Sequence, residues 1–279
     1  MTKALKLGLI GDNIDRSQSP RLHEACGALA GIPVSYARLI PPAMGLTFDE
    51  VFTKAQEDGF DGINVTYPYK ERVTGLVTVD DPAVRAIGAV NTVLFTGAGP
   101  KGFNTDHSGF IRAYRAGRGD AGPGVVCLIG AGGVGKAVAF ALLALDAEKI
   151  ICVDLDRSKA QALADALIGT GTSTRIEVSD AAIDAAHAAD GIINCTPLGM
   201  VNIGGTPLPQ AAMHDASWAF DAVYTPVDTQ FLQDARRAAK TVISGYELFF
   251  AQGLDAWTLF SGQPTDAAAL RAKLQAETA

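Results

Sequence analysis

Residues 125–154, VVCLIGAGGVGKAVAFALLALDAEKIICVD, decide the fold of this chain. The run VVCLI is wholly apolar, which is typical of a strand buried on both faces, and residues 135–146 have the length and composition of a helix. A second apolar run, KIICV, ends at Asp154. This order of strand, glycine-rich turn, helix, strand and acid predicts a Rossmann-type dinucleotide-binding unit.

The turn between the first strand and the helix has the spacing GxGxxG, formed by Gly130, Ala131, Gly132, Gly133, Val134 and Gly135. The first glycine permits a tight turn, the second lets the backbone approach a pyrophosphate, and the third allows close packing of helix on strand. The helix N-terminus then offers free N–H groups and a partial positive charge to the phosphates. A glycine-rich turn in an α/β fold without a nucleotide is the alternative, but the flanking strand and helix favour the dinucleotide.

The end of the second strand bears on the choice between NAD and NADP. Asp154 stands about 20 residues after the glycines, where an acid accepts hydrogen bonds from both ribose hydroxyls. The 2′-phosphate of NADP would face this carboxylate at a cost on the order of a few kcal/mol. Arg157 can offset that repulsion, but it opens the next predicted helix, and Asp156 adds negative charge. We therefore predict NAD as the cofactor, with NADP less favoured.

The rest of the chain also alternates short apolar runs with helical patterns. Before the glycine turn, strands and helices follow one another as KLGLIG (6–11), SPRLHEACGALAG (19–31), VSYARLI (34–40), FDEVFTKAQEDGF (48–60) and DGINVTY (61–67). This rhythm predicts a mostly parallel sheet covered by helices. The stretch AGPKGFN (98–104) is interpreted as a seam before the second α/β unit. From about Tyr246 the sequence is helical and has no strand pattern.

Composition excludes several classes of protein. The chain has 279 residues, 48% hydrophobic and 19% charged, and 23 Lys plus Arg against 30 Asp plus Glu give a net charge of −7. We expect no nucleic-acid or membrane partner, because such a chain has no broad basic face, and any anionic substrate must be met by local groups. The four scattered cysteines predict buried thiols rather than a disulfide or metal site. The start, MTKALKLGLIGDN, has too short an apolar core for a signal peptide, so we expect a cytoplasmic location.

Three polar clusters stand at the ends of predicted elements. They are NVTYPYK (64–70), GAVNTV (88–93) and FNTDHSGF (103–110). Each alone is also typical of ordinary turns, because Asn and Asp favour turns.

Together these motifs resemble the shikimate dehydrogenase family, which includes quinate/shikimate dehydrogenases. The resemblance spans nearly the whole chain, and its motifs occur in order across both halves. They are SQSP (17–20) with His23, NVTYPYK, GAVNT, NTDHSGF, GAGGVGKA (130–137), NCTPLGM (194–200), DAVYTPVDT (221–229), and Gly245 followed by Gln252.

The resemblance implies an α/β fold with an N-terminal α/β substrate domain, a Rossmann-type dinucleotide-binding domain, and C-terminal helices that return to the first domain. The implied substrate domain comprises residues 1–103 joined by helices at 247–279, and the NAD-binding domain comprises 104–246. The implied reaction is reversible hydride transfer between NAD(P) and a ring hydroxyl carbon, interconverting shikimate and 3-dehydroshikimate, without a metal.

The family's site residues carry over onto matching positions of this sequence. Lys70 and Asp106 are the implied catalytic pair, since a lysine amine can take or relay the proton that an alcohol loses on oxidation. The implied substrate-binding residues are Ser17 and Ser19 for the carboxylate, Asn64, Thr66, Asn91, Asp106 and Gln252 for ring hydroxyls, and Tyr224. The implied cofactor-binding residues are the six from Gly130 to Gly135, Asp154, Arg157, Thr196, Leu198, Val223, Gly245 and Leu248.

Some positions depart from the pattern of the biosynthetic members. Arg16 and Glu24 stand where those members commonly have His and Asn, and Asp154-Leu155-Asp156 replaces their Asn-Arg-Thr. These differences resemble the NAD-preferring quinate/shikimate branch, which serves catabolism. Ser19, however, keeps the usual shikimate form. We therefore predict shikimate as the better substrate and quinate as a weaker one.

Other functions stay open. They are an NADP-dependent biosynthetic shikimate dehydrogenase, a related dehydrogenase for aminoshikimate or another cyclic hydroxy acid, and a nucleotide-sensing regulator that kept the fold without the chemistry. The intact Lys70 and Asp106 argue against the regulator. The sequence does not reveal the oligomeric state, and a homodimer is one assembly that it allows.

Overall fold

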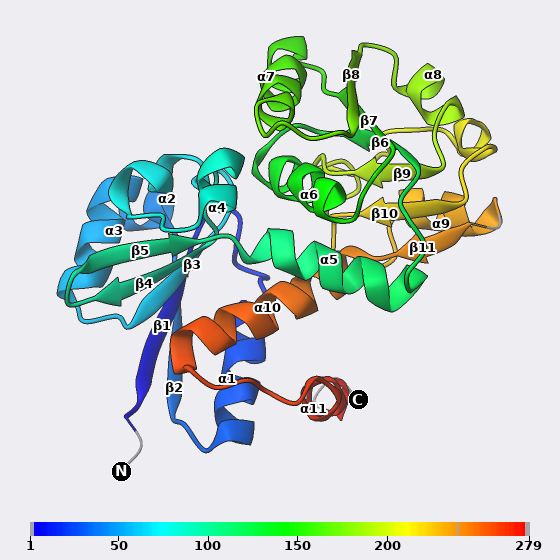
Figure 1. The fold of residues 1–279 in the computed structure, drawn as a ribbon. Coiled ribbons are helices and arrows are strands. Elements are labelled where there is room, and N and C mark those ends of the chain that lie inside the picture. Colours follow the sequence, from blue (N-terminus) through cyan, green and yellow to red (C-terminus); the bar gives the residue numbers. More distant parts are fainter. Residues whose placement is uncertain (1–2, 239, 277–279) are drawn as a thin grey trace. The chain divides into compact units, whose positions relative to one another are not determined.

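The computed structural model describes residues 3–238 and 240–276, and its chain divides into two compact units. Unit 1 comprises Met1–Thr105 with Gln252–Ala279, and unit 2 comprises Asp106–Ala251. Each unit has its own sheet and its own helices (Figure 1).

Unit 1 is built on a five-stranded sheet with the order β2-β1-β3-β4-β5. The strands are β1 (Leu5–Ile10), β2 (Val34–Leu39), β3 (Gly62–Val65), β4 (Thr92–Thr96) and β5 (Gly99–Phe103). The first three are parallel, as the βαβαβ pattern predicts, whereas β4 is antiparallel to both β3 and β5. Interpreting 98–104 as a seam is therefore wrong for most of that stretch. Its polar, glycine-rich composition suggests a linker, but the turn at 97–98 closes a hairpin whose second strand is β5.

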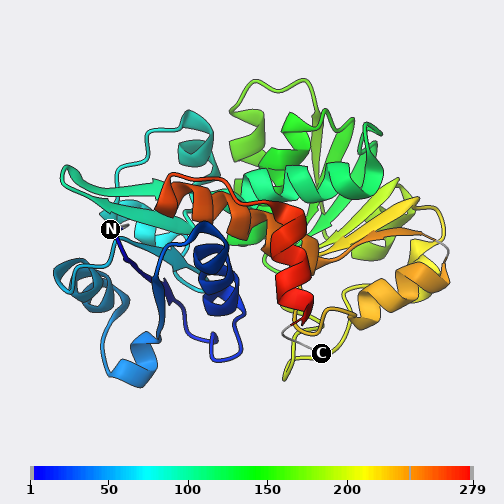
Figure 2. The ribbon, with the colours of Figure 1, turned by 90° about the horizontal axis from the view of Figure 1, so that it is seen from below.

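Helices cover both faces of this sheet. The helical elements are α1 (Ser19–Ala30), α2 (Pro41–Met44), α3 (Phe48–Glu57), the 3₁₀ turn η1 (Arg72–Leu76), α4 (Pro82–Ile87), α11 (Ala267–Ala276) and the end of α10 (Gly245–Ser261). A capping box of Thr47 and Glu50 starts α3, whose apolar face joins a core with Ile63 and Val93. At the sheet residue Gly62 an added Cβ would lie 2.5 Å from the Phe260 ring on α10. Helix α11, at the red end of the chain, packs on the blue helix α1 (Figure 2).

Unit 2 is built on a six-stranded, wholly parallel sheet with the order β11-β10-β9-β6-β7-β8. The strands are β6 (Val125–Ile129), β7 (Lys149–Val153), β8 (Arg175–Ser179), β9 (Gly191–Asn194), β10 (Trp218–Asp221) and β11 (Thr241–Ile243). The three-residue strand β11 does not follow from the sequence pattern, because it is too short to show a period. The order reverses between β6 and β9, and nucleotides bind at such a switch point in α/β sheets.

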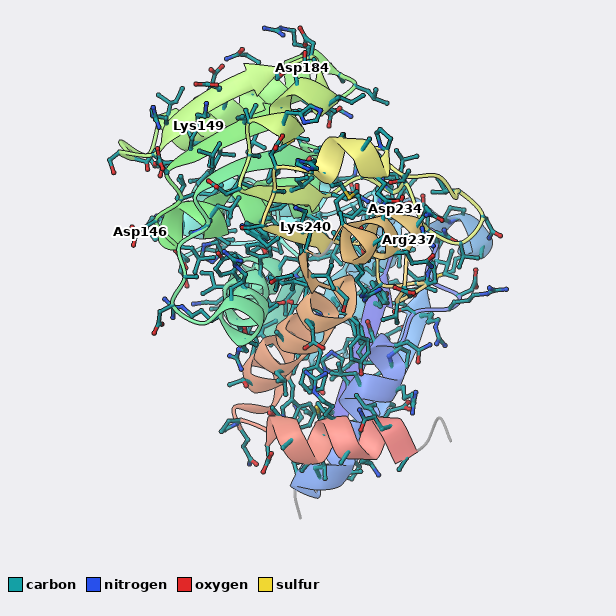
Figure 3. The ribbon with its side chains drawn as sticks, turned by 90° about the vertical axis from the view of Figure 1, so that its right-hand side faces the viewer. Asp146, Lys149, Asp184, Asp234, Arg237 and Lys240 are labelled. Carbon is teal, nitrogen blue, oxygen red and sulfur yellow. The ribbon has the colours of Figure 1, made fainter. Side chains whose placement is uncertain are left out.

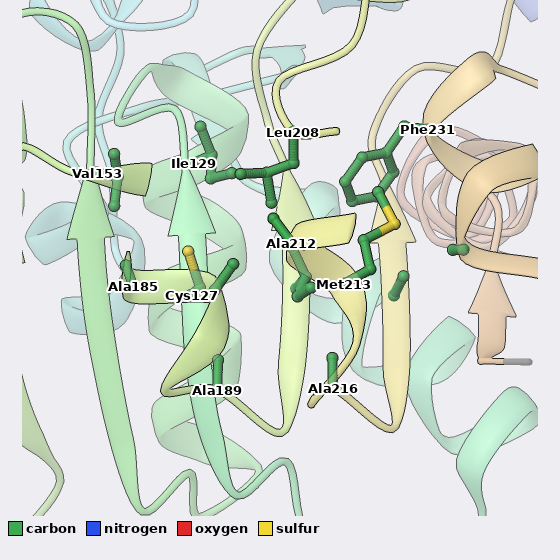
Figure 4. Close-up of a cluster of buried hydrophobic side chains, with 14 of the residues drawn as sticks. Cys127, Ile129, Val153, Ala185, Ala189, Leu208, Ala212, Met213, Ala216 and Phe231 are labelled. Atoms are coloured by element: carbon green, nitrogen blue, oxygen red, sulfur yellow. The ribbon is translucent and has the colours of Figure 1, made fainter. Parts of the chain in front are cut away.

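Helices also cover both faces of the second sheet. The helical elements are α5 (Thr105–Arg118), α6 (Gly133–Ala144), α7 (Arg157–Ile168), α8 (Ala182–His187), the 3₁₀ turn η2 (Gln210–Met213) and α9 (Gln230–Arg237). On one face, Cys127 and Ile129 pack with Ala185, Met213 and Phe231 from α8, η2 and α9 (Figure 4). On α9, the buried Asp234 forms an ion pair of 2.8 Å with the exposed Arg237 (Figure 3).

Three further predictions concern membrane-spanning helices, metal sites and the burial of the cysteines. Within 3–238 and 240–276, no helix is long and apolar enough to cross a membrane. The same residues contain no group of three or more His, Cys, Asp or Glu placed to hold a metal ion. Cys26, Cys127 and Cys152 are buried, as predicted, whereas Cys195 is only partly buried.

Candidate functional site

The carboxyl ends of β1 and β3 carry two predicted substrate-binding loops of unit 1. The strands are parallel with Ile10 opposite Val65, so both loops leave the same edge of the sheet. Two backbone hydrogen bonds join the loops: Thr66 N donates to Ile10 O (2.9 Å) and Asp12 N donates to Tyr67 O (3.2 Å). Sequence positions more than 50 residues apart therefore form one connected surface.

Ser17 and Ser19 lie in the first loop, directly before and at the start of α1. Ser17 is buried, and its hydroxyl donates to the Ser19 hydroxyl at 3.1 Å. Ser19 N donates back to Ser17 Oγ at 3.3 Å. The Ser19 hydroxyl accepts in this pair and keeps its own hydrogen for a further acceptor, such as a carboxylate.

Asn64, at the end of β3, is held on three sides. Its Nδ2 donates to Asn91 O (3.3 Å) and to Thr92 Oγ1 (3.0 Å), and its Oδ1 accepts from the Tyr36 hydroxyl (2.8 Å). Asn64 is 6% exposed. These bonds fix the rotamer of a side chain that is predicted to bind a ring hydroxyl.

Asn91 and Gln252 join the same network. Asn91 Oδ1 accepts from Thr105 N (2.8 Å), and Asn91 Nδ2 donates to Thr105 Oγ1 (3.0 Å). The Thr105 hydroxyl in turn donates to Gln252 Oε1 (3.3 Å). The structure thus brings together Asn64, Asn91 and Gln252, which are far apart in sequence.

The predicted base, Lys70, lies in the loop that follows β3. Lys70 is half-buried, and its carbonyl accepts from Val90 N at 2.8 Å, which ties the loop to the GAVNT motif. The Tyr67–Pro68 peptide before it is cis. Asp106 is buried in the first turn of α5 and is the first residue of unit 2. The Lys70–Asp106 pair therefore stays a prediction.

Sequence reasoning missed several residues that hold this surface in place. The Tyr69 hydroxyl donates to Asp12 Oδ1 at 2.5 Å, and its ring stacks on Phe48 with centroids 4.6 Å apart. Thr92 and Thr105 lie inside the motifs GAVNT and NTDHSGF, but the family resemblance assigns them no role. The burial of these two threonines depends on the fold. In the sequence, only their positions next to the motif residues Asn91 and Asn104 indicate a role.

His23 and Tyr36 form a second supporting contact. His23 is 1% exposed and stacks on Tyr36 with centroids 5.1 Å apart. Burial lowers the pKa of His23 to about 3, although a hydrogen bond with Asn64 opposes that shift. A neutral imidazole of this kind packs behind Asn64 and is not suited to exchange protons near neutral pH.

The glycine-rich turn of unit 2 has the geometry that its spacing predicts. Gly130 has φ of +103°, and a Cβ there would lie 2.7 Å from the backbone carbon of Cys195. A Cβ on Gly135 would lie 1.9 Å from Gly130 O. At Gly132, the N-cap of α6, an added Cβ meets no described atom within 4 Å. Packing therefore explains the first and third glycines, whereas the second suits close approach of a pyrophosphate to the helix N-terminus.

Asp154 lies beside this turn. Its Oδ2 accepts from Ala131 N (2.8 Å) and its Oδ1 accepts from Asp156 N (2.9 Å). Arg157 is exposed and forms an ion pair with Asp180 after β8. Asp154 is thus fixed next to the glycine-rich turn, whereas the guanidinium of Arg157 is paired with Asp180.

The remaining predicted cofactor residues follow β9 and β10. Asn194, at the end of β9, accepts at Oδ1 from Thr196 N (2.9 Å) and donates from Nδ2 to Leu198 O (3.0 Å). Val223 N donates to the Asp221 carboxylate at the end of β10 (3.0 Å).

Helix α10 begins beside these loops. A Cβ on Gly245 would lie 2.5 Å from Val223 O, so the helix start packs directly on the β10 loop. Tyr224 stacks on Phe249 with centroids 4.8 Å apart, and Leu248 is buried in the first turns of the same helix. Val223, Gly245 and Leu248, the last three residues of the predicted cofactor set, therefore lie on two adjoining segments of unit 2.

Comparison with known proteins places the chain in a family. Residues 9–93 match the model of the shikimate dehydrogenase substrate binding domain. The quinate/shikimate dehydrogenase (NAD(+)) of Corynebacterium efficiens is 38% identical over 275 residues, covering 96% of this chain and 97% of the relative. The chain belongs to the shikimate dehydrogenase family. The family resemblance predicted from the motifs is thereby confirmed.

Solved structures of family members agree in fold. Quinate dehydrogenase from Corynebacterium glutamicum in complex with NAD has a TM-score of 0.89 and 35% identity, covering 99% of this chain and 100% of that one. Shikimate 5-dehydrogenase from Thermus thermophilus in complex with NADP(H) and shikimate has a TM-score of 0.84 and 30% identity, covering 96% and 97%. The predicted α/β fold with a Rossmann-type nucleotide-binding architecture is confirmed.

Proposed function

We propose that this protein is an NAD-dependent dehydrogenase that interconverts shikimate and its 3-dehydro ketone, with quinate as a weaker substrate. The observation that carries the proposal is the connected network of Asn64, Asn91, Thr105 and Gln252 beside the serine pair in unit 1. Such a surface offers both hydroxyl and amide groups, which suits a ring that carries several hydroxyls and one carboxylate.

The nucleotide unit fits NAD. The open backbone at Gly132 and the N-terminus of α6 suit a pyrophosphate, and Asp154 stands where ribose hydroxyls are bound. Asp154 disfavours a 2′-phosphate, and Arg157 is already paired with Asp180. The names of the Corynebacterium relatives, which specify NAD, support the same choice.

Four residues of the chain have separate roles in the proposed reaction. When bound, NAD supplies the acceptor for the hydride that leaves the carbinol carbon. Lys70 takes the proton of the hydroxyl as the C=O bond forms, and it returns that proton in the reverse reaction. Asp106 orients Lys70 and the hydroxyl, while Ser17 and Ser19 hold the carboxylate and so fix which ring carbon reacts.

Steady-state kinetics with shikimate and quinate, each with NAD and NADP, test the proposal. We expect the largest kcat/KM for shikimate with NAD. A larger kcat/KM with NADP would overturn the cofactor assignment, and no turnover of either acid would overturn the substrate assignment.

The role of Lys70 has its own test. We expect Lys70→Ala to lower kcat at least about 100-fold, because general acid–base catalysis is worth that much, and to leave the affinity for NAD unchanged. Lys54→Ala, at a surface pair with Asp58 on α3, is the matched control and should keep full turnover. If Lys70→Ala kept full turnover, the assigned base would be wrong.

Two expectations stay predictions: the lack of a nucleic-acid partner and a cytoplasmic location. A homodimer stays one assembly that the sequence allows. The assignment of unit 1 to substrate and unit 2 to NAD is likewise part of the proposal. It is supported by the family match at residues 9–93, which lie within unit 1.

A further inference from the structure

Arg38 stands near the carboxyl end of β2, the edge strand of the first sheet. It lies two residues after Tyr36, so both side chains point to the same face of the strand. Tyr36 reaches Asn64 through its hydroxyl. The face that supports one predicted substrate residue therefore also presents a guanidinium.

Arg38 contacts the loop that holds the serine pair. Its Nη2 donates to the carbonyl of Ser17 at 2.8 Å. The Ser17 N–H donates to Ile14 O, and its hydroxyl donates to Ser19. Arg38 thus completes the set of bonds that fixes Ser17, and it does so from a different strand.

Within the described part of the chain, Arg38 forms no ion pair with an acid, and its hydrogen bond goes to the neutral carbonyl of Ser17. The charged neighbours on the serine loop itself are Asp12, Asp15 and Arg16, of which Asp12 accepts from Tyr69. A guanidinium carries five N–H groups, so several remain for another acceptor beside Ser17.

A bound carboxylate is stabilised by such a charge. The two serines offer only neutral hydroxyls, and the chain as a whole carries a net charge of −7, which repels an anionic substrate. A serine hydroxyl donates one hydrogen bond to a carboxylate, whereas a guanidinium adds an opposite charge and a fork of donors that matches the two carboxylate oxygens. A cation at this position compensates for the repulsion locally.

We infer that Arg38 is a specificity residue for the substrate carboxylate, which holds Ser17 in place and supplies the positive charge that the serine pair lacks. This inference rests on the proposed function, because it takes a cyclic hydroxy acid as the substrate. It predicts that the enzyme distinguishes an acid from its neutral ester mainly through Arg38.

The test compares shikimate with its methyl ester, which keeps the ring and removes the charge. We expect Arg38→Gln to raise KM for shikimate roughly ten-fold, the order expected for loss of one charge-assisted contact, and to change KM for the ester and for NAD little. Arg38→Lys should restore part of the preference for the acid, because it keeps the charge but not the fork-shaped donor set. The KM of the wild type for shikimate should also rise with ionic strength more steeply than that of Arg38→Gln.

Lys54→Gln is the matched control, because it also removes one positive charge from unit 1 but lies on α3 in a surface pair with Asp58. It should leave the preference for the acid unchanged. Equal losses of kcat/KM for acid and ester in Arg38→Gln would show a purely structural role and overturn the inference. Failure of the wild type to oxidise shikimate would instead overturn the proposed function, so the two failures are distinct.

Discussion

At the scale of single residues, the buried carboxylate of Asp221 joins three segments of unit 2. Its Oδ1 accepts from Asn194 Nδ2 and Val223 N (both 3.0 Å), and its Oδ2 accepts from the Thr229 hydroxyl (2.5 Å). Asn194 in turn holds Thr196. One fully buried side chain thereby fixes the loops after β9 and β10, which carry predicted cofactor residues.

Burial raises the pKa of Asp221 from 3.8 to about 6, although its three hydrogen bonds oppose the shift. As pH rises from about 4 to about 6, the unfolded chain releases this proton before the folded protein does. The contribution of Asp221 to stability is therefore fully present below about pH 4 and is lost once pH passes about 6.

Asp221→Asn tests this linkage. An amide can keep the Oδ1 contacts and donate from Nδ2 to Thr229, whose hydroxyl rotates to accept. We expect the free energy of unfolding of the wild type, relative to the variant, to fall by roughly 2 kcal/mol between about pH 4.5 and about pH 7.5. Urea unfolding at both pH values measures it, and a difference that does not change with pH would contradict the assignment.

At the scale of elements, the loops after β1 and β3 act as one surface because Tyr69 and Asp12 link them. We expect Tyr69→Phe to lower kcat/KM for shikimate roughly ten-fold, because it removes the hydrogen bond that ties the residue before Lys70 to Asp12 and keeps the stacking on Phe48. KM for NAD should not change. Tyr67→Phe is the matched control: Tyr67 is 75% exposed, so loss of its hydroxyl should have no effect. Equal effects of the two variants would rule out the link.

The elements also show what the sequence can predict. Continuous apolar runs and glycine spacing predicted β6, α6 and β7, because burial on both faces and a tight turn each leave a local signal. The hairpin partner β5 and the short β11 have no such signal. Tyr36 and Arg38 act through partners 28 and 21 positions away, so their roles follow from the fold and not from local pattern.

At the scale of the whole molecule, unit 1 is assembled from both ends of the chain. Helix α11 packs on α1, where Leu270 and Leu274 are buried and Arg21 donates to Leu274 O. The helix that begins at Ser19 therefore depends on residues about 250 positions later.

Leu270→Ala tests this dependence. We expect it to lower the free energy of unfolding by about 2–4 kcal/mol, as for other buried leucines, and to speed amide hydrogen exchange in α1 while β6 stays protected. Gln275→Ala, at an exposed position of the same helix, should have no effect. Equal acceleration of exchange in α1 and β6 would show that α11 supports the molecule as a whole and not unit 1.

The return of the C-terminal helices also sets an order of events during translation. The ribosome releases β1–β5 first, but α11 leaves the exit tunnel only after every strand of unit 2. One side of α1 therefore stays uncovered until α11 has been synthesised, whereas unit 2 already has all its strands and can form its core. The unit that is synthesised first is therefore the last to be completed.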